Sequence, residues 1–160
     1  MRLLIAAIGK KRSGPEVELF QDYLDRARAV GRHIGFSDLS LHEVDAPKGL
    51  SGPALKKREG EMLLGVLPAG AAVIALDERG DNISSEKLAA LLGHLRDDGA
   101  GDAAFVIGGA DGHDEIVRTK AKRLIAFGAA TWPHMLVRAM LAEQLYRSMT
   151  ILSGHPYHRA

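Results

Sequence analysis

Two glycine-containing segments each follow an apolar run, an arrangement that is common in ligand-binding loops. One is Gly108-Gly109-Ala110-Asp111-Gly112, after residues 103–107, and the other is Phe127-Gly128-Ala129-Ala130-Thr131-Trp132, at the end of the run 123–127. In a parallel sheet, ligands gather at the carboxyl ends of the strands, and glycine lets a ligand approach the main chain closely. One such loop alone is more often only a tight turn. Two of them together favour a binding site.

Neither loop matches a common nucleotide-phosphate motif. Residues 9–14 have the glycine spacing of a P-loop, but Pro15 and Glu16 stand where a P-loop has Lys and Ser or Thr. The segment 108–112 does not match G-x-G-x-x-G and follows the fourth expected strand, whereas the dinucleotide fingerprint follows the first. The pattern therefore favours a ligand with little phosphate that is held by backbone groups.

Charged and aromatic residues near the C-terminus form a second candidate site. Arg138, Glu143 and Arg147 interrupt an apolar segment, and the last two are one helical turn apart, so they can pair. Such charges are either a structural ion pair or part of a site, and the sequence favours neither. The tail carries side chains of the kinds that stack on RNA bases and contact phosphates: His155, Tyr157, His158 and Arg159. Tails of this composition can also be inert.

Composition excludes several kinds of chemistry. The chain has no cysteine, which excludes disulfides, thiolate zinc sites and cysteine nucleophiles, and no carboxylate completes a metal set with the two tail histidines, so we expect no metal. The net charge is only +1, so RNA contact requires local basic clusters, at residues 10–12, 56–58 and 118–123. No apolar run reaches the roughly 20 residues of a transmembrane helix. We expect a cytoplasmic protein without membrane contact.

Alternating apolar strands and amphipathic segments predict an α/β fold with helices on both faces of a mostly parallel sheet of five to six strands. Strands are expected at residues 3–8, 38–44, 71–76, 103–107 and 123–127, and the second strand has one wetter face, which places it near an edge. Helices are expected at about 15–27, 53–66, 84–96, 113–121 and 133–149. The third strand is expected to end in a polar turn at 77–80. With no linker or repeat, residues 1–160 are expected to form a single domain.

The expected last helix is apolar on nearly every side. A helix of this kind must be buried nearly all round. Because C-terminal elements usually lie on the outside of a domain, the sequence favours a symmetric homodimer in which this helix is covered by a partner. The alternative is a central helix of a monomer.

Four ordered blocks of the chain resemble a known family. They are residues 105–112, 131–138, 142–148 and 155–159. They look like the signature segments of the RlmH-type 23S rRNA pseudouridine N3-methyltransferases of the SPOUT class, and the similarity spans the whole chain.

This resemblance implies a C-terminal trefoil knot, one of the rare exceptions to the rule against knotted chains. It implies that S-adenosyl-L-methionine lies in the knot, in a homodimer in which the tail of one subunit completes the site of the other. The cofactor contacts that it implies are Leu76, Gly108, Phe127, Gly128, Ala129, Ala130, Thr131 and Trp132.

The implied reaction is methylation of a pseudouridine in the helix 69 region of 23S rRNA, on assembled ribosomes. The sulfonium already activates the methyl group, so alignment dominates, but the ring nitrogen must lose a proton. Candidates for proton removal, base anchoring and phosphate contact are Glu143, Arg147, Tyr157, His158 and Arg159. The general base stays open between His158 and Glu143. A ribosome-associated RNA-binding module and a flavodoxin-like nucleotide-binding protein are the alternatives to an enzyme.

Overall fold

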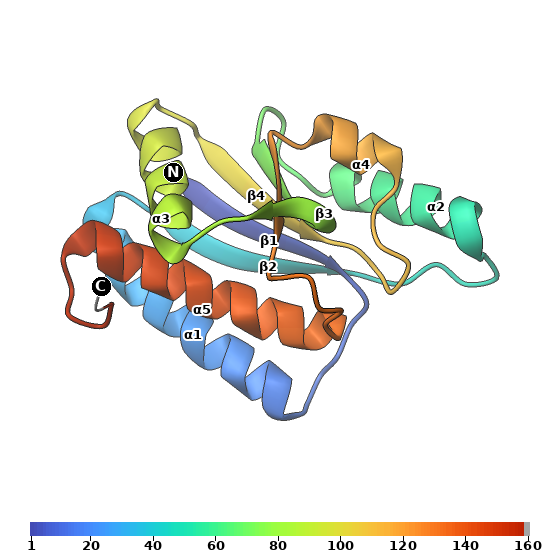
Figure 1. Cartoon of the computed structure of the whole chain (residues 1–160), viewed down its shortest axis with the longest axis horizontal. Helices are drawn as coiled ribbons and strands as arrows, with labels where there is room; N and C mark the ends of the chain where they lie inside the picture. Colours follow the sequence, from blue (N-terminus) through green and yellow to red (C-terminus); the bar gives the residue numbers. More distant parts are fainter. Residues whose placement is uncertain (159–160) are drawn as a thin grey trace.

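The computed structural model describes residues 1–158 and is built on a five-stranded sheet with all neighbouring strands parallel (Figure 1). The strand order is β2-β1-β4-β3-β5. The strands are β1 (Arg2–Ile8), β2 (Asp38–Val44), β3 (Ala72–Asn82), β4 (Asp102–Ile107) and β5 (Arg123–Ala126). The predicted fold class is confirmed, and β2 lies at a sheet edge as its alternating pattern predicted.

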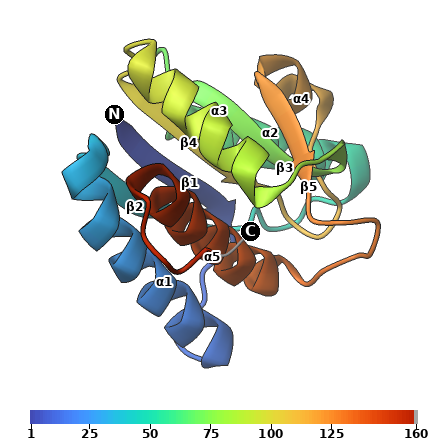
Figure 2. The ribbon, with the colours of Figure 1, turned by 60° about the vertical axis from the view of Figure 1, so that its left-hand side comes forward.

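Helices cover both faces of the sheet, with α1, α3 and α5 on one face and α2 and α4 on the other (Figure 2). Their bounds are α1 (Pro15–Gly31), α2 (Gly52–Gly65), α3 (Ser85–Asp97), α4 (Glu115–Lys120) and α5 (His134–Ser153), with a short 3₁₀ turn at Arg32–Ile34.

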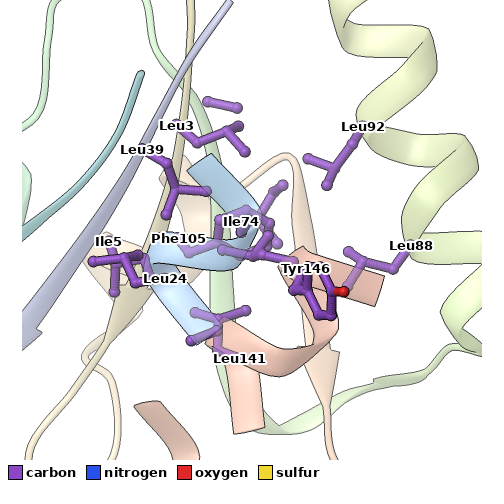
Figure 3. Packing of buried hydrophobic residues seen from close by; sticks show 14 of the residues in the cluster. Leu3, Ile5, Leu24, Leu39, Ile74, Leu88, Leu92, Phe105, Leu141 and Tyr146 are labelled. Carbon is purple, nitrogen blue, oxygen red and sulfur yellow. The ribbon is translucent and has the colours of Figure 1, made fainter. Parts of the chain in front are cut away.

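Alternate residues of β1 enter different cores, because successive strand side chains point to opposite faces. Leu3 and Ile5 pack with the residues of α1, α3 and α5 (Figure 3), whereas Ala6 and Ile8 pack with the residues of α2 and α4. This explains why the central strands are apolar at nearly every position.

Local capping signals set the helix starts. The Ser84 side chain accepts a hydrogen bond from the backbone N–H of Lys87, and Asp114 accepts one from Ile116. Helix α4 therefore begins at Glu115 and not at the predicted residue 113, because Asp114 is its N-cap.

The prediction that β3 ends at Leu76 in a turn was wrong. The strand continues to Asn82. Residues 74–76 pair with residues 123–125 of β5, and after a register shift residues 81–82 pair with residues 125–126. Gly80 lies directly on β5, since a Cβ built there would be 2.5 Å from the backbone of Ile125. The polar residues 77–80 look like a turn locally, but a contact with a distant segment holds them extended.

Helix α5 lies between α1 and α3 and is largely covered within its own chain (Figure 2). Leu141, Leu145 and Met149 are completely buried. The sequence favoured burial of this helix by a partner over the alternative of a central helix, but α1, α3 and the sheet bury most of its apolar surface within one chain. The homodimer itself stays a prediction.

Replacing Gly80 by alanine should lower the free energy of unfolding by about 2 kcal/mol, because a methyl group is forced against the β5 backbone. Urea denaturation measures the effect. Gly101→Ala is the control, since a Cβ at Gly101 meets no atom within 4 Å. Equal unfolding midpoints for the two variants would contradict the close crossing.

Candidate functional site

A pocket lies where the middle of β3 and the carboxyl end of β5 meet the loop that leads into α5. Its wall is formed by three sets of residues: Leu76, Asp77 and Glu78 from β3; Ile125 and Ala126 from β5; and the loop 127–132, with Val137 of α5 beyond it. The structure therefore brings together Leu76, Phe127, Gly128, Ala129, Ala130, Thr131 and Trp132 from the residues predicted to bind the cofactor.

The loop 127–132 is held in place at both ends. The backbone N–H of Gly128 donates to Oδ1 of Asn82 at 2.8 Å, and Gly128 has a φ of 92°, in the left-handed region that favours glycine. The indole N–H of Trp132 donates to the carbonyl oxygen of Phe127 at 2.9 Å. The small residues between them leave the main chain accessible along this wall.

Buried Arg138 fixes the start of α5 relative to the sheet. Its guanidinium forms an ion pair with Glu43 at 2.8 Å and donates to the carbonyl oxygens of Ile8 and Gly9. Burial lowers the pKa of Arg138 and the Glu43 carboxylate opposes that shift. This charge has a structural role, since it ties the helix that follows the pocket loop to the end of β1.

Gly108 does not line the pocket. A Cβ built on it would lie 3.2 Å from the ring of His113 and 3.3 Å from the backbone of Gly112, so the glycine loop is folded tightly on itself. Gly108 follows Ile107, which is paired with Leu76 of the pocket wall. The segment 108–112 therefore leaves the strand next to that wall.

Asp77 is a pocket residue that the sequence did not single out. Its carboxylate forms an ion pair with Arg118 of α4 at 2.8 Å and accepts a hydrogen bond from the backbone N–H of Arg79. Burial acts to raise the pKa of Asp77, but these donors outweigh it and the pKa falls below its ordinary value. The available signal was an acidic residue directly after a buried strand, which was interpreted as part of a turn.

A second cluster surrounds the carboxylate of Glu143 in the C-terminal half of α5. Oε1 of Glu143 accepts hydrogen bonds from Arg147 Nε at 2.9 Å and from the Tyr157 hydroxyl at 3.1 Å. Oε2 accepts from Gln144 at 2.7 Å, and Gln144 in turn accepts from the hydroxyl of Ser85. The tail therefore folds back onto its own helix.

The predicted catalytic residues largely gather in this cluster. The Arg147 guanidinium lies 4.9 Å from the centre of the Tyr157 ring and 3.5 Å from Nδ1 of His158. The other ring nitrogen of His158 lies 2.9 Å from the Glu86 carboxylate, without hydrogen-bond geometry. Arg159 lies outside the described residues.

The pocket and the cluster share no residue. The pocket ends at Val137 on α5 and the cluster begins at Glu143, which is roughly 9 Å further along the helix axis at 1.5 Å per residue. Within one subunit, the described part of the tail therefore does not line the pocket.

The three predicted basic clusters are partly neutralised. Lys10 pairs with Asp45, Arg58 with Glu61, and Arg118 with Asp77. A separate groove between α3 and β5 has Lys87, His94 and Arg123 among its lining residues. This groove is an alternative place for contact with a polyanion.

The described residues hold neither a candidate metal site nor a helix that could span a membrane. Over residues 1–158, no three His, Cys, Asp or Glu side chains are grouped so that they could hold a metal ion. In the same part of the chain, no helix is both long enough and apolar enough to cross a membrane.

A family model and full-length relatives indicate the same family. The family described as "Predicted SPOUT methyltransferase" matches residues 1–158. Relatives named "Ribosomal RNA large subunit methyltransferase H" are 54% identical over 159 residues in Paramagnetospirillum magneticum, with 99% of both chains covered, and 52% identical over 160 residues in Rhodospirillum centenum, with 100% of both chains covered. The solved SpoU methyltransferase AviRb from Streptomyces viridochromogenes, in complex with AdoMet, is 10% identical with a TM-score of 0.37, covering 92% of this chain and 59% of its own.

Replacing Glu143 by glutamine should lower the pKa of the Tyr157 phenol. Burial raises this pKa above its ordinary value of about 10, and Tyr23 and the Glu143 carboxylate raise it further. The folded state therefore keeps a proton that the unfolded chain loses, so this contribution to stability is complete below about pH 10 and is lost as the pH rises above it.

Ultraviolet absorbance of tyrosinate, with the Tyr157→Phe variant subtracted, measures this titration. A Tyr157 titration that is the same with Glu143 and with glutamine would show that the carboxylate does not control the phenol.

Proposed function

Because the chain belongs to the SPOUT methyltransferase family, we propose that it transfers a methyl group from S-adenosyl-L-methionine to N3 of a pseudouridine in the helix 69 region of 23S rRNA. The observation that carries this proposal is the pocket between β3, β5 and the loop 127–132. The names of the full-length relatives support ribosomal RNA of the large subunit as the substrate. We propose that the whole chain forms a single methyltransferase domain, with its C-terminal half in the trefoil knot that the family implies.

The residues present fit S-adenosyl-L-methionine. Leu76 and Val137 give the pocket apolar surface for a flat base, and the small residues 128–130 expose backbone donors and acceptors. The exposed Glu78 lies in the same wall, where its carboxylate favours a positively charged ligand, whereas the Asp77 carboxylate is already paired with Arg118. We assign Gly108 an indirect role, since it follows Ile107, which is paired with Leu76 of the pocket wall.

When bound, the cofactor supplies a methyl group on a positively charged sulfur, which is already activated for transfer. The reaction forms a bond between the methyl carbon and N3, breaks the bond between that carbon and sulfur, and releases the N3 proton. The protein must therefore align the base and accept one proton.

We assign proton acceptance to His158 and base positioning to the groups around Glu143. The Glu143 carboxylate already accepts hydrogen bonds from Arg147, Tyr157 and Gln144, so it is committed to holding those side chains. Histidine is the side chain that most often moves protons in enzymes. Arg147 and Arg159 are the cations for phosphate or carbonyl contact.

The separation of pocket and cluster within one chain supports a homodimer with composite sites. In this arrangement, the cluster of one subunit faces the pocket of the other. Exposed apolar side chains next to these regions support the association, since Leu19 of α1 is 44% exposed and Trp132 of the pocket loop is 42% exposed. The substrate places the enzyme in the cytoplasm, where ribosomes are assembled.

A chain that ends at Ser153 should bind S-adenosyl-L-methionine but transfer labelled methyl groups to ribosomes at least about 100-fold more slowly than the intact chain. Calorimetry measures cofactor binding, and transfer is measured on ribosomes from cells that lack the gene. The single changes His158→Ala and Tyr157→Phe show how much of the loss caused by the truncation comes from each of these side chains.

The outcomes separate the candidate functions. If the intact chain gives no binding heat with S-adenosyl-L-methionine, it is not this enzyme. Binding heat with nucleotides in its place would indicate a nucleotide-binding protein. An intact chain that binds ribosomes without transferring methyl groups is an RNA-binding module. Full activity after truncation would remove the tail from the mechanism.

Mixed dimers should recover activity from two inactive variants. Ala130→Trp fills the pocket from an exposed loop, and His158→Ala disables the tail, so each homodimer is inactive. If the tail acts on the partner's pocket, each mixed dimer has one intact site, and random association gives about one quarter of the wild-type activity. Two sites built each from a single subunit would give no recovery.

A further inference from the structure

Glu59 of α2 is a buried carboxyl group that the mechanism above does not use. It is 4% exposed, and its Oε2 has no hydrogen-bond partner among residues 1–158. It lies in a helix stripe that is otherwise apolar, next to buried Leu63. An unpartnered buried carboxyl group is costly, and an apolar side chain of similar size would avoid that cost.

The carboxyl group of Glu59 lies directly against the glycine loop. A Cβ built on Gly109 would be 2.6 Å from Oε1 and 2.8 Å from Oε2 of Glu59, so a side chain at that position would force the Glu59 carboxyl group to move. Burial raises the pKa of Glu59 and nearby Asp111 adds to the rise, while the backbone N–H of Gly109 opposes it. The main chain of the loop at Gly109 is therefore in direct contact with the Glu59 carboxyl group.

The glycine loop connects Glu59 to the pocket wall through the ends of two strands. Gly108 packs on the ring of His113, and Nε2 of His113 lies 3.2 Å from the carbonyl oxygen of Val106 in β4. The next residue of β4, Ile107, is paired with Leu76, which lines the pocket.

We propose that Glu59 is a positioning residue for the methyl-donor site, which holds the loop 108–112 and, through it, the Leu76–Asp77 part of the pocket wall. This inference rests on the proposed function. Glu59 touches neither the pocket nor the cluster around Glu143, so its effect is on the shape of the site and not on the chemical step.

The test compares Glu59→Ala, Glu59→Gln and Glu61→Ala. The Glu61 control removes a carboxylate from the same helix that is exposed and pairs only with Arg58. Glu59→Ala should weaken S-adenosyl-L-methionine binding about tenfold in calorimetry and raise its KM to match, with kcat within about twofold, because the wall is displaced. Glu59→Gln keeps an acceptor for the loop and should stay within about threefold of wild type.

Hydrogen exchange separates this proposal from the proposed function. Without any cofactor, Glu59→Ala should speed exchange of the amides at 108–112 and at Leu76 and Asp77, and Glu61→Ala should not. If the intact chain binds no cofactor but this change in exchange is present, the enzyme assignment fails and the loop contact stands. A Glu59→Ala variant that unfolds more easily but binds the cofactor normally would make Glu59 merely structural.

The single change Gly109→Ala covers the case in which Glu59→Ala does not fold, and a double-mutant cycle joins the two changes if both variants fold. Gly109→Ala displaces the same carboxyl group from the other side and should weaken cofactor binding by a similar factor. In a Glu59→Ala background, Gly109→Ala should add little, because the group that it displaces is gone. Fully additive effects of the two changes would overturn the proposal.

Discussion

The contact of Gly80 with the backbone of β5 is the constraint on which the candidate site depends. It lets residues 77–82 run extended over β5, and the carboxyl ends of β3 and β5 then lie side by side. The pocket is made of residues 76–78 of β3, the end of β5 and the loop that leaves β5. A knotted SPOUT chain requires close passages of this kind, and only a residue without a side chain permits main chain to lie on main chain.

Helix α5 serves the core and the site with different parts of its surface. Leu141, Leu145 and Met149 pack into the main core, whereas Glu143 and Arg147 bind the tail. The long apolar helix is thus rigid where it carries polar groups. Rigid support matters for a methyl transfer, in which alignment provides most of the rate.

The opposite face of the sheet holds its own polar groups next to the same rim. Glu59, His113 and Asp77 are all buried, and they lie behind or in the pocket wall. Burying each of these polar side chains costs free energy that an apolar residue would not, unless its contacts are needed for the shape of the site. Departures of this kind from simple burial rules are expected at functional sites, where the shape of a loop matters more than its stability.

The sequence by itself determined the order and approximate positions of the strands and helices and the two loop segments, because these depend on local periodicity and glycine content. It also placed Glu143, Arg147, Tyr157 and His158 close enough in the chain to form one cluster. Only the tertiary structure decided that β3 continues past Leu76, that residues of β3, β5 and the loop 127–132 share one pocket, and that α1 and α3 cover α5. These outcomes depend on contacts between segments far apart in the chain, such as Gly80 with Ile125, and no local pattern records them.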